Sequence, residues 1–154
     1  MDTFYRDLKR GKAIEKAVLN IVMNTYPDAK IIDGYCKEWD IFIPSKNFGV
    51  EVKSDLKSKY TGNLVIETSF NGRPSALNTT KAKIWVFYTG DKFLFTTPEK
   101  IRKVISDNNL HEVTFTGKGD TKSKTAYLVK KFLIEQIAEI FPILVTHGRH
   151  KPLL

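Results

Sequence analysis

The sequence has 154 residues, enough for a single domain with its own hydrophobic core. Its formal net charge is +8, from 25 basic and 17 acidic residues, which favours a polyanionic partner such as a nucleic acid. No apolar run is long enough to span a membrane and the charged N-terminus is unlike a secretory signal, so we expect a cytoplasmic protein with no membrane segment. The single cysteine, Cys36, excludes an internal disulfide and a cysteine-based zinc site.

The chain opens with the pattern of an amphipathic helix, which we expect over residues 3–25. Apolar residues recur at the spacing of one helical face: Ile14, Ala17, Val18, Ile21 and Val22. Glu15 lies at the edge of that stripe, where a side chain can reach a site at the rim of a sheet. The alternative is a solvated glutamate paired with Lys12 or Lys16.

A strand is expected over residues 29–36, and the stretch WDIFIPSKNFGVEVK at residues 39–53 predicts a hairpin. Residues 39–43 and 50–53 are rich in β-branched and aromatic side chains, and a polar turn separates them. Alternate side chains of a strand share a face, so Glu51 and Lys53 lie together. The hairpin then places Asp40 opposite or diagonal to them.

Two carboxylates and an ammonium are unusual on strands, where Asp and Lys are depleted. Neighbouring acids repel each other unless a cation neutralises them, and Mg²⁺ suits such a pair because it takes one or two carboxylates and keeps several waters. Lys53 would then hold a phosphate or orient a water beside the ion. The alternative is an exposed hairpin with an ordinary pair between Glu51 and Lys53.

The middle of the chain predicts a polar loop over residues 54–62 and a strand over residues 63–70. Glu67 interrupts that apolar strand, either as a further ligand on the side of Glu51 or as an edge glutamate facing solvent. Residues 71–81 form a loop whose hydroxyl, amide and basic groups suit phosphate oxygens. An ordinary connection rich in Gly, Pro and Asn is the alternative for that loop.

The C-terminal half predicts a hairpin of strands at residues 83–89 and 92–97, then a helix opening at Pro98 with Thr97 as its cap. A short strand at 111–116, a flexible basic loop at 117–124, a strand at 126–132 and a helix at 133–141 follow. Residues expected to contact a nucleic acid are Arg73, Ser75, Lys81, Lys118, Lys122 and Lys124.

The pattern Asp40-x10-Glu51-x-Lys53 on a hairpin resembles the PD-(D/E)xK nuclease superfamily, which has the restriction-endonuclease-like fold. The runs Ile66-Glu67-Thr68, Gly72-Arg73-Pro74-Ser75 and Trp85-Val86-Phe87-Tyr88 are similar to its phage-encoded branch. Trp39 stands where the family has a proline. Lys81-Ala82-Lys83 replaces an Asp that precedes the Trp-containing strand in that branch.

The resemblance implies an α/β domain, with a mixed sheet of about five strands flanked by helices and the site at one edge. It implies that Asp40, Glu51 and the Val52 carbonyl bind Mg²⁺, which Mn²⁺ can replace, and that Lys53 assists hydrolysis of DNA. Glu15 matches the place of an extra acid on the family's first helix. Glu67 is a candidate for a further ligand of the metal or of a water.

A small domain without a separate recognition module suggests structure-directed cutting, as in junction-resolving endonucleases, which are usually homodimers. A phage-encoded enzyme of this kind would act in the host cytoplasm. The alternatives are a restriction-type nuclease, a single-strand-specific exonuclease and a non-enzymatic nucleic-acid-binding domain. Binding alone gains nothing from two acids near a phosphate, which argues against the last.

Overall fold

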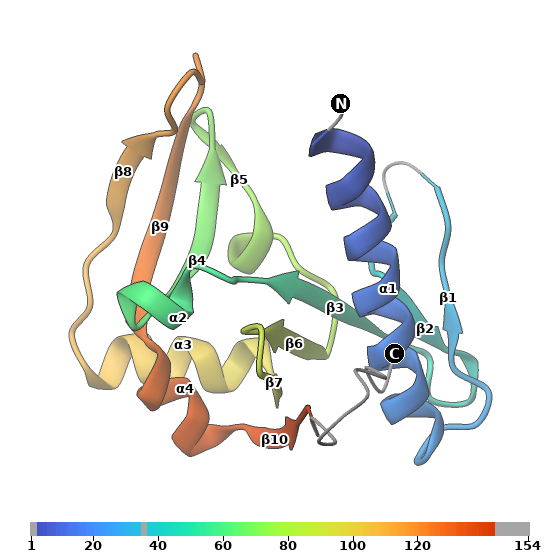
Figure 1. Ribbon diagram of the computed structural model, residues 1–154. Helices are drawn as coiled ribbons and strands as arrows, with labels where there is room; N and C mark the ends of the chain where they lie inside the picture. Colours follow the sequence, from blue (N-terminus) through green and yellow to red (C-terminus); the bar gives the residue numbers. More distant parts are fainter. Residues whose placement is uncertain (1–2, 35–36, 144–154) are drawn as a thin grey trace, which may run out of the picture.

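The computed structural model describes residues 3–34 and 37–143, which form two β-sheets and four α-helices (Figure 1). The expected α/β class is confirmed. The expected mixed sheet is present with six strands instead of about five, and a second, antiparallel sheet of four strands was not expected. Cys36 lies outside the described residues. The strand expected at 29–36 is wrong for most of its length, because β1 covers only Lys30–Ile31 and the described residues 32–34 are not in a strand. Within these ranges no helix combines the length and apolar character that a membrane crossing requires.

The larger sheet is mixed and has the order β1-β2-β3-β6-β7-β10. Its strands are β1 (Lys30–Ile31), β2 (Ile41–Ile43), β3 (Phe48–Ser54), β6 (Ile84–Tyr88), β7 (Lys92–Thr96) and β10 (Glu139–Pro142). Only the β3–β6 pair is parallel among these described strands. The apolar stripe of helix α1 (Thr3–Met23) packs on one face, where Val18, Ile41 and Val50 are fully buried.

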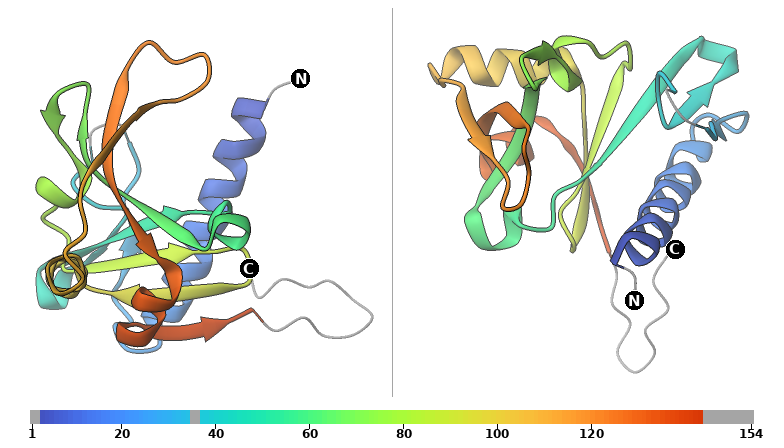
Figure 2. Two further views of the ribbon diagram at one scale, coloured as in Figure 1. Left: turned by 90° about the vertical axis from the view of Figure 1, so that its left-hand side faces the viewer. Right: turned by 90° about the horizontal axis from the view of Figure 1, so that it is seen from above.

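The smaller sheet is antiparallel and has the order β5-β4-β9-β8. Its strands are β4 (Asn63–Phe70), β5 (Arg73–Pro74), β8 (Val113–Thr116) and β9 (Ser123–Lys130). One face joins α3 (Pro98–Asp107), α4 (Lys131–Ile137) and the second face of the larger sheet in a common core, which includes Leu64, Trp85 and Ile101. Seen from above, this sheet and α1 flank the long strand β3 (Figure 2, right).

Most expected elements form close to their predicted bounds. The hairpin of β2 and β3 turns through the 3₁₀ helix η1 (Pro44–Lys46), and β4 begins and ends where the sequence predicts. The β6–β7 hairpin is confirmed, and Thr97 Oγ1 caps α3 by accepting from the Lys100 amide at 3.2 Å.

Other expectations are wrong in informative ways. The loop at 54–62 contains the short helix α2 (Ser58–Thr61), which the Asp55 carboxylate steadies by accepting from the Ser58 amide at 3.2 Å. The final helix stops at Ile137, because residues 139–142 pair with β7 and Phe141 packs edge-on against Phe95. The basic loop at 117–124 is shorter than expected, since β9 already begins at Ser123.

Candidate active site

The expected site residues on the β2–β3 hairpin meet at its open end. Ile41 pairs with Val50, so Asp40 stands opposite Glu51, and the Asp40 amide donates to the Val50 carbonyl at 3.0 Å. Lys53 shares the face of Glu51, as strand alternation predicts. The site is not at the sheet edge, which corrects that expectation, because β3 is the third strand in the order.

A close approach of backbone to side chain shapes the hairpin beside Asp40. Trp39 stacks on Phe42 with ring centroids 5.4 Å apart and lies against Gly49 on the facing strand. A Cβ at position 49 would collide with the Trp39 side chain, so only glycine fits there. This packing fixes the backbone from which Asp40 projects.

Asp40 is buried and both of its carboxylate oxygens are held. Oδ2 accepts from the Val52 amide at 2.7 Å, and Oδ1 lies 3.0 Å from Lys37 Nζ. The amide and carbonyl of one strand residue point to the same side, so the Val52 carbonyl also faces the space beside Asp40. The structure therefore places two of the expected metal ligands next to each other.

Glu15 reaches the site from α1. Its Oε1 lies 3.4 Å from Lys37 Nζ, so its partner is Lys37 and not the neighbouring Lys12 or Lys16. Burial raises the pKa of Glu15, and the negative charge of Asp40 raises it further. Lys37 was missed by the sequence analysis, because it lies in irregular chain where no periodicity marks it; its position three residues before Asp40 was the available signal.

Glu51 and Lys53 form the second half of the site. Lys53 Nζ lies 3.0 Å from Glu51 Oε1 and 5.3 Å from the centre of the Trp85 ring, and Trp85 Nε1 donates to Thr80 Oγ1 at 3.0 Å. Burial raises the pKa of Glu51, and Asp40 adds to that effect while Lys53 opposes it. The lysine head is therefore anchored between a carboxylate and an indole.

A pocket of about 430 Å³ opens in front of Glu51 and Lys53. Glu67 lines it from β4, which is an inner strand, so the alternative of an edge glutamate facing solvent does not hold. Ser75 Oγ donates to Glu67 Oε2 at 2.6 Å, which directs this hydroxyl to a carboxylate instead of a phosphate. Lys81 lines the rim and pairs with Glu38 at 3.1 Å.

The remaining basic candidates lie at different distances from the pocket. Lys124, on β9, lines an adjoining pocket that shares Lys53 and Glu67 with the first. Lys122 lies further out, with Nζ 5.8 Å from the centre of the Phe70 ring. Neither pocket is lined by Arg73 or Lys118, which lie on β5 and in the β8–β9 turn.

The donor set suits a hard divalent cation. Asp40, Glu51 and the Val52 carbonyl would supply oxygen ligands. Burial raises the pKa of Glu51 and the charge of Asp40 raises it further, and a bound cation would favour the ionised carboxylate. Residues 3–34 and 37–143 contain no ready-made cluster of three or more His, Cys, Asp or Glu side chains for a metal. Any ion would thus rely on two carboxylates, a backbone carbonyl and water, with Glu15 near them.

Comparisons with family models, with curated proteins and with solved structures find no significant match for this chain. The assignment of the site therefore rests on its residues and their geometry.

The raised pKa of Glu51 leads to a prediction about stability. Because its folded-state pKa exceeds the unfolded value, its contribution to stability is fullest at low pH and is lost as the pH rises through the folded pKa. Glu51→Gln should therefore stabilise the protein by roughly 1 kcal/mol at neutral pH, and less as the pH falls. Thermal unfolding against pH measures this.

The matched control is Glu139→Gln, since Glu139 is exposed on β10 and outside the site. At each pH in the same range, the unfolding temperature of this variant should stay close to that of the wild type. A Glu51→Gln protein less stable than wild type at neutral pH would show that the ionised carboxylate is stabilising where it stands.

Proposed function

We propose that this protein is a divalent-metal-dependent nuclease that hydrolyses phosphodiester bonds in DNA. One observation carries the proposal: Asp40 and Glu51 converge beside the Val52 backbone, and Lys53 is held on the same face at an open pocket. A structural hairpin has no need for two adjacent carboxylates whose charges repel each other. The resemblance of these residues to the PD-(D/E)xK pattern supports the same activity.

Each residue of the site has a distinct role in this reaction. Asp40, Glu51 and the Val52 carbonyl would hold Mg²⁺, or Mn²⁺ in its place, which would supply Lewis acidity and a bound water of lowered pKa. Lys53 stabilises the negative charge that develops on the phosphate, or orients the attacking water. Glu15 and Lys37 flank Asp40 and set its position and charge.

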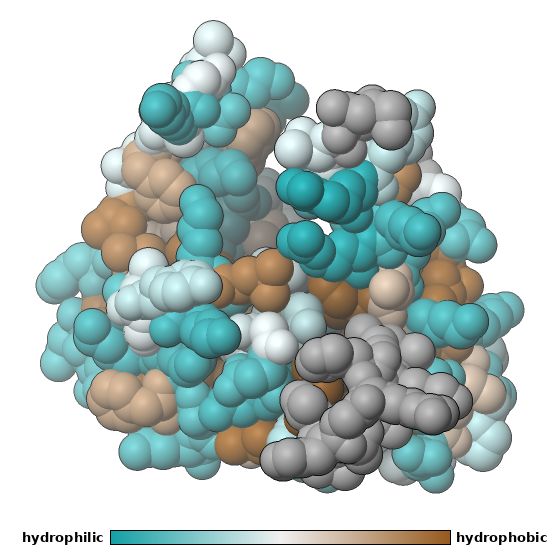
Figure 3. Space-filling view, in the orientation of Figure 1, coloured by the Kyte–Doolittle hydropathy of each residue, from teal (hydrophilic) through white to brown (hydrophobic). Residues whose placement is uncertain are grey.

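The shape and charge of the surroundings suit a nucleic acid. The N-terminal part of α1 and the tips of the smaller sheet rise on either side of a hollow, at whose base β3 runs (Figures 1 and 3). Helix α1 carries five basic residues along its length, of which Lys9 points outward: Arg6, Lys9, Arg10, Lys12 and Lys16. A DNA backbone between these walls would reach Lys53.

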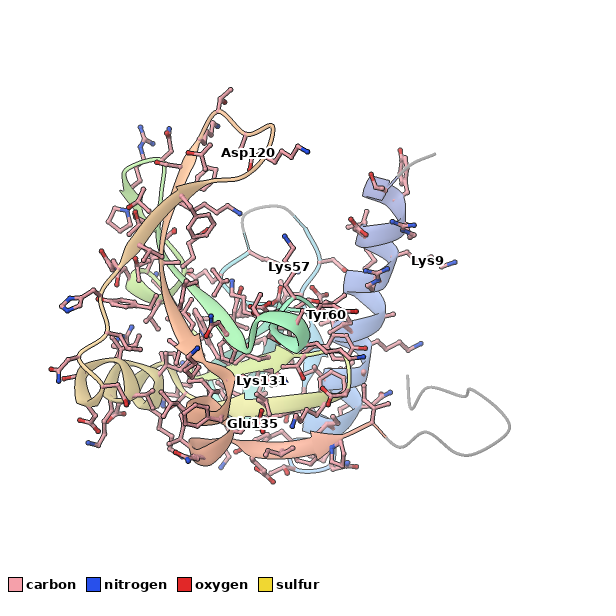
Figure 4. All side chains as sticks on the ribbon, turned by 60° about the vertical axis from the view of Figure 1, so that its left-hand side comes forward. Lys9, Lys57, Tyr60, Asp120, Lys131 and Glu135 are labelled. Atoms are coloured by element: carbon pink, nitrogen blue, oxygen red, sulfur yellow. The ribbon has the colours of Figure 1, made fainter. Side chains whose placement is uncertain are left out.

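The two walls make a prediction about DNA affinity. Lys57 projects toward the hollow, whereas Lys9 points away from it on the outer side of α1 (Figure 4). Lys57→Ala should weaken DNA binding and reduce the slope of log affinity against log salt by about one unit, whereas Lys9→Ala should change both far less. Titration at several salt concentrations measures this, and equal effects of the two changes would contradict the proposed path.

The proposal is tested by incubating the protein and Mg²⁺ with single-stranded, duplex and four-way branched DNA, together with a single-stranded circle. Cleavage of at least one substrate is expected, and cutting of the circle identifies an endonuclease. Preference for the branched DNA, with a dimer in solution, would support the junction-resolving type. Intact substrates at saturating protein, with Mg²⁺ and with Mn²⁺, would refute the nuclease assignment.

A further inference from the structure

The smaller sheet has one open face beside the candidate site. Leu64, Ile66 and Val129 point into the core on its other face. Directly paired residues of antiparallel strands share a face, so the open face follows from the register: Val65 pairs with Leu128, Ala126 with Glu67 and Val113, and Lys124 with Phe115 and Phe70. The bulge between Glu67 and Ser69 turns Phe70 to this side.

This face exposes more apolar surface than a solvated sheet needs. Five of its residues leave more than a third of their surface open to solvent: Val65 at 44%, Leu128 at 42%, Val113 at 40%, Phe115 at 38% and Phe70 at 37%. Phe70 and Phe115 flank Lys124 in one row across three strands, and Lys122 Nζ lies over the Phe70 ring. Aromatic rings therefore alternate with ammonium groups along the row.

The face runs into the candidate site without a break. A pocket of about 270 Å³ is lined by Val65, Phe115 and Lys124 on the open face, and by Lys53 and Trp85 on the larger sheet. Lys53 and Trp85 also line the pocket in front of Glu51. A chain whose phosphate lay at Lys53 could thus place a neighbouring nucleotide against Phe115.

The chemistry of the face selects among nucleic acids. A duplex keeps its bases stacked inside and presents its phosphates outward. Phosphates make no favourable contact with exposed phenylalanine rings. Unpaired bases stack on aromatic rings, while lysines between the rings meet the phosphates of the same strand. A second copy of this chain is disfavoured, because face-to-face pairing would bring Lys122 and Lys124 together with their copies.

Resting on the proposed nuclease function, we infer that this open face binds unpaired nucleotides next to the scissile phosphate, with Phe115 as a stacking platform. The occupant is single-stranded DNA, or the single-stranded part of a branched or frayed molecule. Lys124 and Lys122 hold its backbone. The substrate class of the site is then DNA with unpaired bases near the point of cutting.

The test is binding without metal, measured by fluorescence anisotropy with a single strand, a duplex of equal length, and a single strand with abasic positions. Phe115→Ala should weaken binding of the intact single strand about tenfold, since a stacked base contributes roughly that much. Binding of the duplex and of the abasic strand should change less than about twofold. Phe115→Trp should retain the affinity for the single strand.

The matched control is Phe132→Ala, because Phe132 is 56% exposed on α4 and outside both pockets. It should bind all three DNAs like wild type. If Phe115→Ala does not fold, Phe115→Leu keeps an apolar side chain without the ring and should show the same selective loss.

Equal loss on all three DNAs, or none on the intact single strand, would overturn the inference. Sedimentation that shows a dimer dissociated by Phe115→Ala would assign the face to a second copy instead. The readout is independent of cleavage: cutting without base-dependent binding would leave the nuclease proposal standing, and base-dependent binding without cutting would refute the nuclease alone.

Discussion

Asp40→Asn and Glu51→Gln should each reduce DNA cleavage to background while DNA affinity stays the same or rises. Each change removes one of the two carboxylates that the proposed metal site requires. Each also removes a negative charge from a surface that faces phosphate, so affinity should not fall. Single-turnover cleavage in Mg²⁺ and anisotropy in Ca²⁺ measure the two quantities.

The two variants are expected to differ in their effects on stability, so a loss of cleavage can be separated from a loss of folding. Asp40 accepts from the Val52 amide and pairs with Lys37, so its replacement disturbs local contacts. Glu51→Gln should instead stabilise the protein at neutral pH. A Glu51→Gln protein that is folded, binds DNA and does not cut would locate the loss in chemistry, whereas wild-type cleavage rates would refute the assignment of the acids.

Lys53→Ala should lower the single-turnover rate by about a hundredfold or more, as for other preorganised electrostatic groups. Its ammonium is anchored by Glu51 and the Trp85 ring at the pocket, so the charge is fixed where a phosphate would react. Removing Lys53 also removes an influence that lowers the pKa of Glu51. The comparison should therefore be repeated at higher pH, which favours the ionised form of Glu51 in both proteins.

The control for Lys53 is the double change of Lys122 and Lys124 to Ala. These lysines lie on the smaller sheet and its turn, and should act as backbone contacts. Their loss should weaken binding and reduce the salt slope by about one unit per contact, with the saturated rate preserved. If Lys53→Ala instead binds weakly but cuts normally once saturated, Lys53 is only another phosphate contact.

Local sequence patterns predicted the arrangement of the central site residues. Strand alternation places Glu51 and Lys53 on one face, and the register of β2 with β3 sets Asp40 opposite Glu51 as expected. The apolar stripe of α1 predicted that Glu15 lies at its edge, and from there the Glu15 side chain reaches Lys37. These features depend on neighbours within one hairpin or one helix, which a single sequence records.

What the sequence did not predict depends on contacts between distant segments. The separate smaller sheet arises because β4 pairs with β9. These two strands are far apart in the chain, and no local pattern encodes their pairing. From the sequence alone, the apolar run after Lys131 fits either a helix or a strand. Residues 139–142 form a strand because they pair with β7. Phe115 became a candidate only when the register placed it on the open face beside Lys124.

The most direct test of the central claim is DNA cleavage by the wild-type protein after thorough chelation and after metal is returned. EDTA should abolish cleavage, Mg²⁺ or Mn²⁺ should restore it, and Ca²⁺ should support binding without turnover. Glu51→Gln, purified in parallel, should stay inactive under every condition, which excludes a contaminating nuclease. Cleavage that continues undiminished after chelation would contradict the account.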